Sequence, residues 1–180
     1  MTRVGVLGIG NVLMGDDAVG PYAVKLLEAR YELPPGVELH ELGTPGADLS
    51  LHLEGLEVAI VIDAVRVRGA PGELRLLDKQ QLLARGPIAP SSPHEPGLRE
   101  ALFALELRGG GPAEVLLIGV VPARIELAIG LSPPVQAALP AAIGEVLRRL
   151  EALSLPASLR PAPREPDTWW ERGLEPEGET

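Results

Sequence analysis

Cysteine is absent from the 180 residues, and aromatic side chains make up only 3% of them. Without thiols the chain has no disulfide bonds, no cysteine ligands for zinc or iron–sulfur clusters and no cysteine nucleophile. Basic residues are also few, because 16 Lys and Arg stand against 25 Asp and Glu and leave a net charge of −9. That charge opposes phosphate backbones and anionic lipid, which argues against nucleic acid or a membrane surface as a partner.

Long apolar runs are missing as well. No segment of the sequence approaches the roughly 20 apolar residues that cross a bilayer. The first residues, Met1 to Arg3, lead straight into a strand-like segment without the apolar stretch of a signal peptide. We therefore expect a cytoplasmic protein, and at this length a single folded domain.

What the sequence does contain is an alternation of apolar strands and amphipathic helices. The expected strands are residues 4–7, 37–42, 58–62, 73–77 and 114–121. The expected helices are residues 18–30, 47–53, 98–107 and 134–153. Strands that alternate with helices predict an α/β fold, a mostly parallel twisted sheet with helices on both faces. Residues 58–62 are apolar throughout, as buried parallel strands are, whereas 73–77 alternates and fits an edge.

The last 25 residues differ from the rest. Residues 156–180 hold five prolines, six acidic residues and both tryptophans, and they have no periodicity. We expect a domain over residues 1–155 and a Pro-rich acidic tail over 156–180 that is extended or disordered. Because two exposed indoles are costly to leave in water, we expect Trp169 and Trp170 to dock on the chain's own domain.

A glycine loop follows the first strand. Gly8 and Gly10 match the start of a dinucleotide fingerprint, but Leu13 stands near the place of its third glycine. Two carboxylates, Asp16 and Asp17, then come at the start of the next helix, where they would repel a pyrophosphate. Nucleotide binding is therefore disfavoured. Either carboxylate can instead cap the helix, although one cap needs only one of them.

Two further polar residues stand where ligands bind in such folds. Asp63 follows the apolar run 58–62, and the carboxyl ends of parallel strands are where ligands lie in an open sheet. The loop that holds Asp17 emerges at the same edge. His94 lies in a loop rich in Pro and Ser. Asp17, Asp63 and His94 together would offer two oxygens and one nitrogen, a set suited to nickel or zinc. The alternatives are a helix cap for each Asp and a solvated surface position for His94.

Five short blocks, in order, resemble the nickel–iron hydrogenase maturation proteases. The first block is residues 8–20, GIGNVLMGDDAVG. The others are residues 62–64 (IDA), 92–94 (SPH), 117–122 (LIGVVP) and 129–133 (IGLSP). The resemblance runs from the first strand to about Leu153. It implies a hydrolase on a phosphorylase/hydrolase-like α/β fold, an endopeptidase that removes the C-terminal peptide of a hydrogenase large-subunit precursor after nickel insertion.

The resemblance also implies roles for single residues. Asp17, which stands where many members have Glu, would contact the metal together with Asp63 and His94, and the same three would serve catalysis. The metal would be nickel carried by the precursor, and zinc or cadmium could occupy the site in vitro. Glu41, Gly43 and Thr44 match a segment that the family associates with substrate recognition. Leu42 replaces a glycine of that segment, so the class of hydrogenase served stays open.

Two alternatives remain at this stage. A peptidyl-tRNA hydrolase also opens with a strand and Gly-x-Gly-Asn. That family expects a histidine soon after the loop, but none occurs before His40, and the net charge disfavours tRNA. A nickel-dependent hydrogenase chaperone that binds the precursor without cutting it would need the same motifs. Serine hydrolysis is disfavoured, because no nucleophile-elbow Gly-x-Ser-x-Gly surrounds Ser91 or Ser92.

Overall fold

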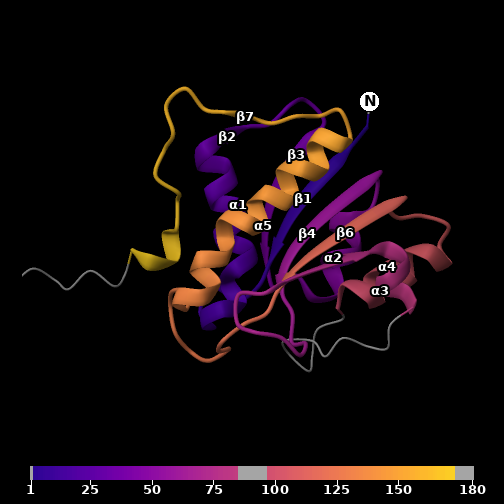
Figure 1. Cartoon of the computed structure of the whole chain (residues 1–180). Helices are drawn as coiled ribbons and strands as arrows, with labels where there is room; N and C mark the ends of the chain where they lie inside the picture. Colours follow the sequence, from indigo (N-terminus) through magenta and orange to yellow (C-terminus); the bar gives the residue numbers. More distant parts are fainter. Residues whose placement is uncertain (1, 85–96, 173–180) are drawn as a thin grey trace, which may run out of the picture.

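The computed structural model describes residues 2–84 and 97–172. Its centre is a five-stranded sheet in the order β3-β1-β4-β6-β5 (Figure 1). Four strands are parallel: β1 (Val4–Ile9), β3 (Val37–Gly43), β4 (Val58–Ala64) and β6 (Glu114–Val120). The fifth, β5 (Leu74–Asp78), runs antiparallel to β6 at one edge. The predicted mostly parallel sheet with an edge strand near residues 73–77 is confirmed.

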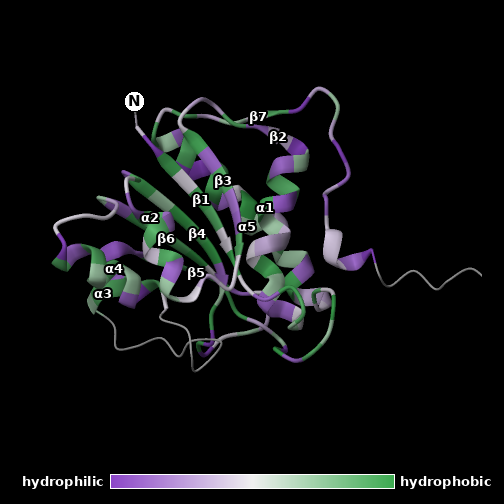
Figure 2. Cartoon of the chain, turned by 180° about the vertical axis from the view of Figure 1, so that it is seen from behind, coloured by the Kyte–Doolittle hydropathy of each residue, from purple (hydrophilic) through white to green (hydrophobic). Residues whose placement is uncertain are grey.

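Helices cover both faces of this sheet, as predicted (Figures 1 and 2). One face packs against α1 (Val19–Arg30) and α5 (Pro133–Ala152). The other face packs against α2 (Leu49–Leu53), α3 (Lys79–Ala84) and α4 (Leu98–Leu107). Short 3-10 turns are η1 (Gly15–Ala18), η2 (Gly46–Asp48) and η3 (Trp169–Glu171).

The strands are apolar on both faces because each face has its own core. Along β4, Ile60 and Ile62 join the core under α1 and α5, whereas Ala59 and Val61 join the core under the other helices. Successive side chains of a strand point to opposite faces, so a strand covered on both sides reads as a continuous apolar run. In Figure 2 the sheet is correspondingly rich in hydrophobic residues.

Some predicted boundaries differ from the structure. The strand expected over 58–62 continues through Asp63 to Ala64, because β6 pairs with both residues. The helix expected from residue 18 begins at Val19, since the chain enters it through η1. The helix expected over 98–107 has those bounds. Helix α3 was not expected.

The part of the tail that the structure describes lies against the domain. Its strand β7 (Ser158–Leu159) pairs with β2 (Tyr31–Glu32), and the chain then follows an irregular path to η3 (Figure 1). Trp170 is buried edge-to-face against Tyr22 of α1, with ring centroids 5.0 Å apart. Trp170 therefore docks on its own domain, as expected, while Trp169 stays 52% exposed. Residues 173–180 of the expected tail lie outside the described residues.

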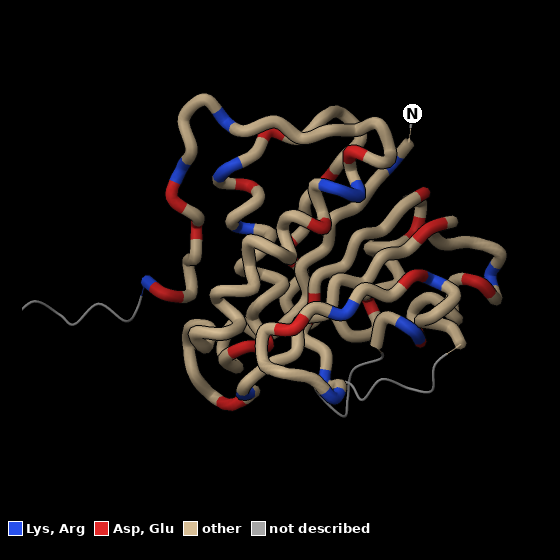
Figure 3. The backbone as a smooth tube through the Cα atoms, viewed as in Figure 1, with Lys and Arg blue, Asp and Glu red and all other residues tan. Residues whose placement is uncertain are grey.

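Charged residues of both signs are mixed along most of the described chain, but between Arg30 and Arg66 every charged residue is acidic (Figure 3). Several ion pairs join near neighbours, such as Lys25 with Glu28 and Arg124 with Glu126. Among the helices that the structure describes, none is both long and apolar enough to cross a membrane.

Candidate functional site at the carboxyl ends of the parallel strands

The chain order of the strands creates a switch point between β1 and β4. From β1 the chain passes through α1 on one face to β3, and from β3 it returns through α2 on the other face to β4. Because the two crossovers lie on opposite faces, the carboxyl ends of β1 and β4 meet at a topological switch point, the usual ligand site of open α/β sheets. Asp17, in the turn after β1, and Asp63, near the end of β4, flank this point.

Asp17 is held close to the loop that follows β1. Its side chain is 2% exposed in the turn η1, and its Oδ2 accepts a 2.8 Å hydrogen bond from the backbone N–H of Asn11. Gly10 makes this approach possible, because a Cβ there would lie 1.7 Å from the carbonyl oxygen of Asp17. Gly10 also has a φ of +143°, which side-chain-bearing residues rarely adopt. The glycine loop therefore determines where the Asp17 carboxylate lies.

Helix α1 begins directly on the strand ends. A Cβ on Gly20 would overlap the carbonyl oxygens of Ile9 and Ile62, so only glycine lets the first turn of the helix pack this closely. Because Ile62 precedes Asp63, this packing puts η1 against the end of β4. Asp63 itself is half-buried and lies opposite Gly119 of β6. The structure therefore brings Asp17 and Asp63 to one edge of the sheet, as their sequence positions predict.

Asp16 has a different role from its neighbour. It is fully buried, and its carboxylate accepts hydrogen bonds from the backbone N–H groups of Ala123 and Arg124 and from both the N–H and the hydroxyl of Ser132. The alternative that Asp16 or Asp17 is the N-cap of the following helix is not what the structure has, because the N-cap positions of η1 and α1 are Met14 and Ala18. The 3-10 turn before α1 directs both carboxylates toward neighbouring loops instead.

The segment expected to recognise substrate lies beside this edge. Gly43 ends β3 with a φ of +57°, and its carbonyl oxygen accepts a 2.8 Å hydrogen bond from the N–H of Gly10. Leu42 is the extra residue of a β-bulge, and its side chain packs on the core under α2 and α4. Glu41 is half-buried and Thr44 is exposed. The loop of β3 and the loop of β1 are thus tied together at the carboxyl end of the sheet.

His94 lies outside the described residues, so its place in the site stays a prediction. Within residues 2–84 and 97–172, no three His, Cys, Asp or Glu side chains form a group that could hold a metal ion. The ligand set of Asp17, Asp63 and His94 therefore depends on the histidine.

The sequence did not reveal the contacts that fix the site. Asp16 binds groups 107 to 116 residues away, which no local pattern reveals. Ser132 carried a partial signal, because it lies in the motif IGLSP and precedes two prolines at a helix start. Gly20 carried another, since a glycine near the first turn of a helix usually has a packing reason.

Comparison with known proteins identifies the same family over most of the chain. The family model for hydrogenase maturation protease matches residues 21–149. The Hydrogenase 2 maturation protease of Escherichia coli is 37% identical over 161 residues, which cover 89% of this chain and 98% of that protein. The hydrogenase expression/formation protein HoxM of Azotobacter vinelandii is 36% identical over 86% of this chain and 75% of its own length.

Solved structures agree with these relatives. A hydrogenase maturating endopeptidase from Escherichia coli superposes with a TM-score of 0.80 at 35% identity, over 88% of this chain and 98% of that one. A hydrogenase 2 maturation peptidase from a Thaumarchaeota archaeon gives a TM-score of 0.62 at 37% identity, over 84% and 98% of the two chains. The α/β fold predicted from the sequence is the fold of these endopeptidases.

Proposed function

This chain belongs to the hydrogenase maturation protease family, and on that premise we propose that it cuts the C-terminal peptide from a nickel–iron hydrogenase large-subunit precursor after nickel insertion. It is a peptidase, and the precursor is its proposed macromolecular partner. The observation that carries the proposal is the placement of Asp17 and Asp63 on either side of the switch point between β1 and β4. Two carboxylates at one edge can engage a cation that arrives with the substrate.

In this proposal the nickel belongs to the substrate. Asp17, Asp63 and His94 contact the nickel already held by the precursor and bring the scissile peptide beside them. Three ligands without a thiolate bind nickel modestly on their own, which suits recognition of a metal that another protein supplies. Zinc or cadmium would occupy the same ligands in the isolated protein. Precursor without nickel would lack the contact and would be left uncut.

The chemical step is hydrolysis of one peptide bond. A water oxygen attacks the scissile carbonyl carbon, the carbon–nitrogen bond breaks, and the leaving amine takes up a proton. A carboxylate at the switch point or the His94 imidazole accepts the proton of the attacking water. The burial of Asp17 supports this role, because a carboxylate fixed by the Asn11 N–H keeps its position when substrate binds.

The loop at the end of β3 is the proposed contact for the rest of the substrate. Glu41 and Thr44 both reach solvent at this edge, and Gly43 joins the loop to the backbone of the β1 loop. A substrate bound along Glu41, Gly43 and Thr44 therefore lies next to the turn that carries Asp17. We also propose that the reaction takes place in the cytoplasm.

The test is the intact mass of nickel-loaded and nickel-free precursor before and after incubation with the protein. Loss of a C-terminal peptide from the loaded form alone is the expected result. An unchanged mass of both forms, with binding retained, would replace the proposal by a chaperone that does not cut. Cleavage of both forms would keep the peptidase and remove nickel as its recognition element.

A further inference from the structure

Asp16 is the most completely buried charged side chain at the site, and the proposed reaction does not use it. Its Oδ2 accepts hydrogen bonds from the N–H groups of Ala123 and Arg124, at 2.8 and 3.0 Å, and from the hydroxyl of Ser132 at 2.8 Å. Its Oδ1 accepts the N–H of Ser132 at 2.6 Å. A buried carboxylate with this many donors is fixed in one orientation.

Ser132 hydrogen-bonds to Asp16 instead of capping its own helix. It occupies the N-cap position of α5, where serine normally accepts a hydrogen bond from the first turn of its own helix. No such side-chain cap bond is present, and its hydroxyl donates to Asp16 instead. Pro133 and Pro134 follow and have no N–H groups, so the helix needs less capping. The serine therefore connects α5 to the turn that carries Asp17.

Backbone bonds complete the same connection. The N–H of Gly15 donates to the carbonyl of Ala128, the N–H of Ala128 donates to Leu13, and the N–H of Asp16 donates to Arg124. The loop 123–132 between β6 and α5 is thus bonded to the segment 13–16 through the backbone as well. Asp16 is the side chain that links them.

We propose that Asp16 is a positioning residue, which fixes the turn η1 to the loop 123–132 and thereby sets the place of the Asp17 carboxylate. The two residues are consecutive in one 3-10 turn, so a rotation that releases Asp16 also moves Asp17 away from the Asn11 N–H. The geometric part of this proposal needs only the contacts described. Its effect on cleavage rests on the proposed function.

The sharpest variant is Asp16→Asn, because it keeps the shape and changes the hydrogen bonding. Both carboxylate oxygens accept N–H donors, whereas an amide offers one acceptor oxygen and one donor nitrogen. Whichever way the amide turns, its nitrogen faces an N–H group of Ala123 and Arg124 or of Ser132. One side of the connection must therefore open.

The Asn11 amide reports the position of Asp17 without any cleavage assay. In Asp16→Asn we expect the Asn11 N–H resonance to move toward the one it has in Asp17→Ala, and its hydrogen exchange to become about tenfold faster. With loaded precursor, kcat is expected to fall about tenfold while KM stays within about twofold, because the loop of β3 is untouched.

Two further variants separate positioning from folding. Ser132→Ala removes one of the bonds to Asp16 and is expected to shift the Asn11 amide in the same direction by less, which keeps a test if Asp16→Asn does not fold. Val146→Ala opens a hole in the buried face of α5, about 20 Å from Ser132 along the helix, and should lower the melting temperature without moving the Asn11 amide or kcat.

An Asn11 amide with unchanged resonance and exchange in both Asp16→Asn and Ser132→Ala would overturn the proposal. The same holds if Val146→Ala shifts the amide as much as they do. A shifted amide with normal cleavage would instead confirm that Asp16 positions Asp17 and would remove Asp17 from the proposed reaction.

Discussion

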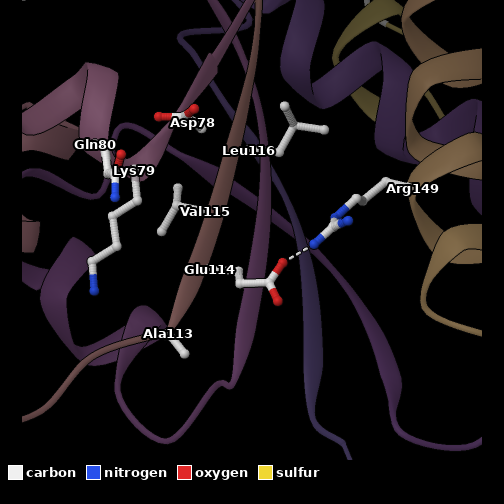
Figure 4. Close-up of a pocket in the computed structure, with 8 residues that line it drawn as sticks. All are labelled: Asp78, Lys79, Gln80, Ala113, Glu114, Val115, Leu116 and Arg149. Carbon is white, nitrogen blue, oxygen red and sulfur yellow. Dashed lines mark hydrogen bonds and ion pairs between the residues drawn. The ribbon is translucent and has the colours of Figure 1, made fainter.

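The two ends of the sheet hold their charged groups in opposite ways. At the carboxyl ends of β1 and β4, Asp16 and Asp17 are buried and accept hydrogen bonds from backbone N–H groups. At the amino end of β6, Glu114 and Arg149 form an ion pair across a hollow of about 390 Å³, with 56% and 29% of their side chains exposed (Figure 4). Lys79, on the wall of the same hollow, pairs with Glu106.

This difference in burial distinguishes charged groups that the fold holds in place from an ordinary ion pair at the surface. Burying a carboxylate costs free energy unless donors replace its water, so the donors around Asp16 and Asp17 must be supplied by the fold. An exposed ion pair gains little, because water and salt screen it. The two cations on the wall of the hollow, Lys79 and Arg149, are already paired with acidic side chains. Buried carboxylates held by backbone donors are therefore the reason that we propose the carboxyl end, rather than the hollow, as the functional end.

The largest effect is expected from removing a carboxylate at the carboxyl end. Asp17→Asn and Asp63→Asn keep the size of the side chain but lose its negative charge. In the proposed reaction that charge binds the metal and accepts the proton of the attacking water. We expect each to lower the rate of precursor processing about a thousandfold, within the range of acid–base contributions. The measurement is the single-turnover rate, followed by the intact mass of the precursor.

The matched control for these variants is Glu114→Gln, which removes a carboxylate at the opposite end. It should process precursor at the normal rate, because Glu114 faces the hollow and lies far from the switch point. Equal losses in Glu114→Gln and Asp17→Asn would break the comparison, since charge at either end would then matter alike.

The next effect concerns the glycines that let backbone approach backbone. Gly20→Ala would force the new methyl group into the carbonyl oxygens of Ile9 and Ile62, and we expect it to lower the free energy of unfolding by about 3 kcal/mol. Gly144→Ala is the control, because a Cβ there meets nothing within 4 Å in the middle of α5. It should stabilise the fold by about 1 kcal/mol through helix propensity. Thermal unfolding of both variants measures the contrast, and a stable Gly20→Ala would show that the close approach is not required.

The sequence predicts the carboxyl end well because its signals are local. Five apolar residues followed by Asp63 indicate a buried parallel strand whose end carries a carboxylate, and the structure has β4 there with Asp63 one pair from its end. The strand–helix alternation predicts that Asp17 emerges at the same edge. Those arguments need only a few neighbouring residues each.

Other features depend on distant or overlooked partners. Asp16 and Asp17 look alike in the sequence. Only the hydrogen bonds of Asp16 to groups more than 100 residues away show that it fixes the fold. Helix α3 is too short to show a periodic pattern, but the residues at its start carry a recognisable helix-start motif. Asp78 and Gln81 exchange hydrogen bonds as a capping box, in which each side chain bonds the other's backbone N–H. That pattern would have predicted the helix.

Tyr22, in the first half of α1, adds to this comparison a buried group that is neutral. Burial, and then its hydrogen bond to Glu171, raise the pKa of Tyr22 above its ordinary 10.0. Above pH 10 the unfolded chain loses this proton while the folded chain keeps it, so stability should fall as pH rises past 10. Tyr22→Phe should cost about 1 kcal/mol at neutral pH and make that fall shallower.

Denaturant unfolding between pH 8 and 11, read by circular dichroism, measures this slope. Only two lysines and one other tyrosine accompany Tyr22 in the chain, so few groups share the pH range. Tyr31→Phe is the control and should keep the slope, because Tyr22 remains. An identical slope in Tyr22→Phe and the unaltered protein would mean that the contact with Glu171 and the tail does not hold the phenol's proton.

The smallest effect is expected at the hollow. A double-mutant cycle of Glu114→Gln and Arg149→Met should give a coupling energy below about 1 kcal/mol at 0.15 M salt, because both side chains reach water. The coupling should shrink further at 1 M salt, where exposed charges are screened within about 3 Å. A coupling well above 1 kcal/mol that persists in high salt would mean that the pair is as fixed as the carboxylates at the other end. In that case burial and backbone donors would no longer distinguish the two ends of the sheet, and the hollow would have to be considered a second built site.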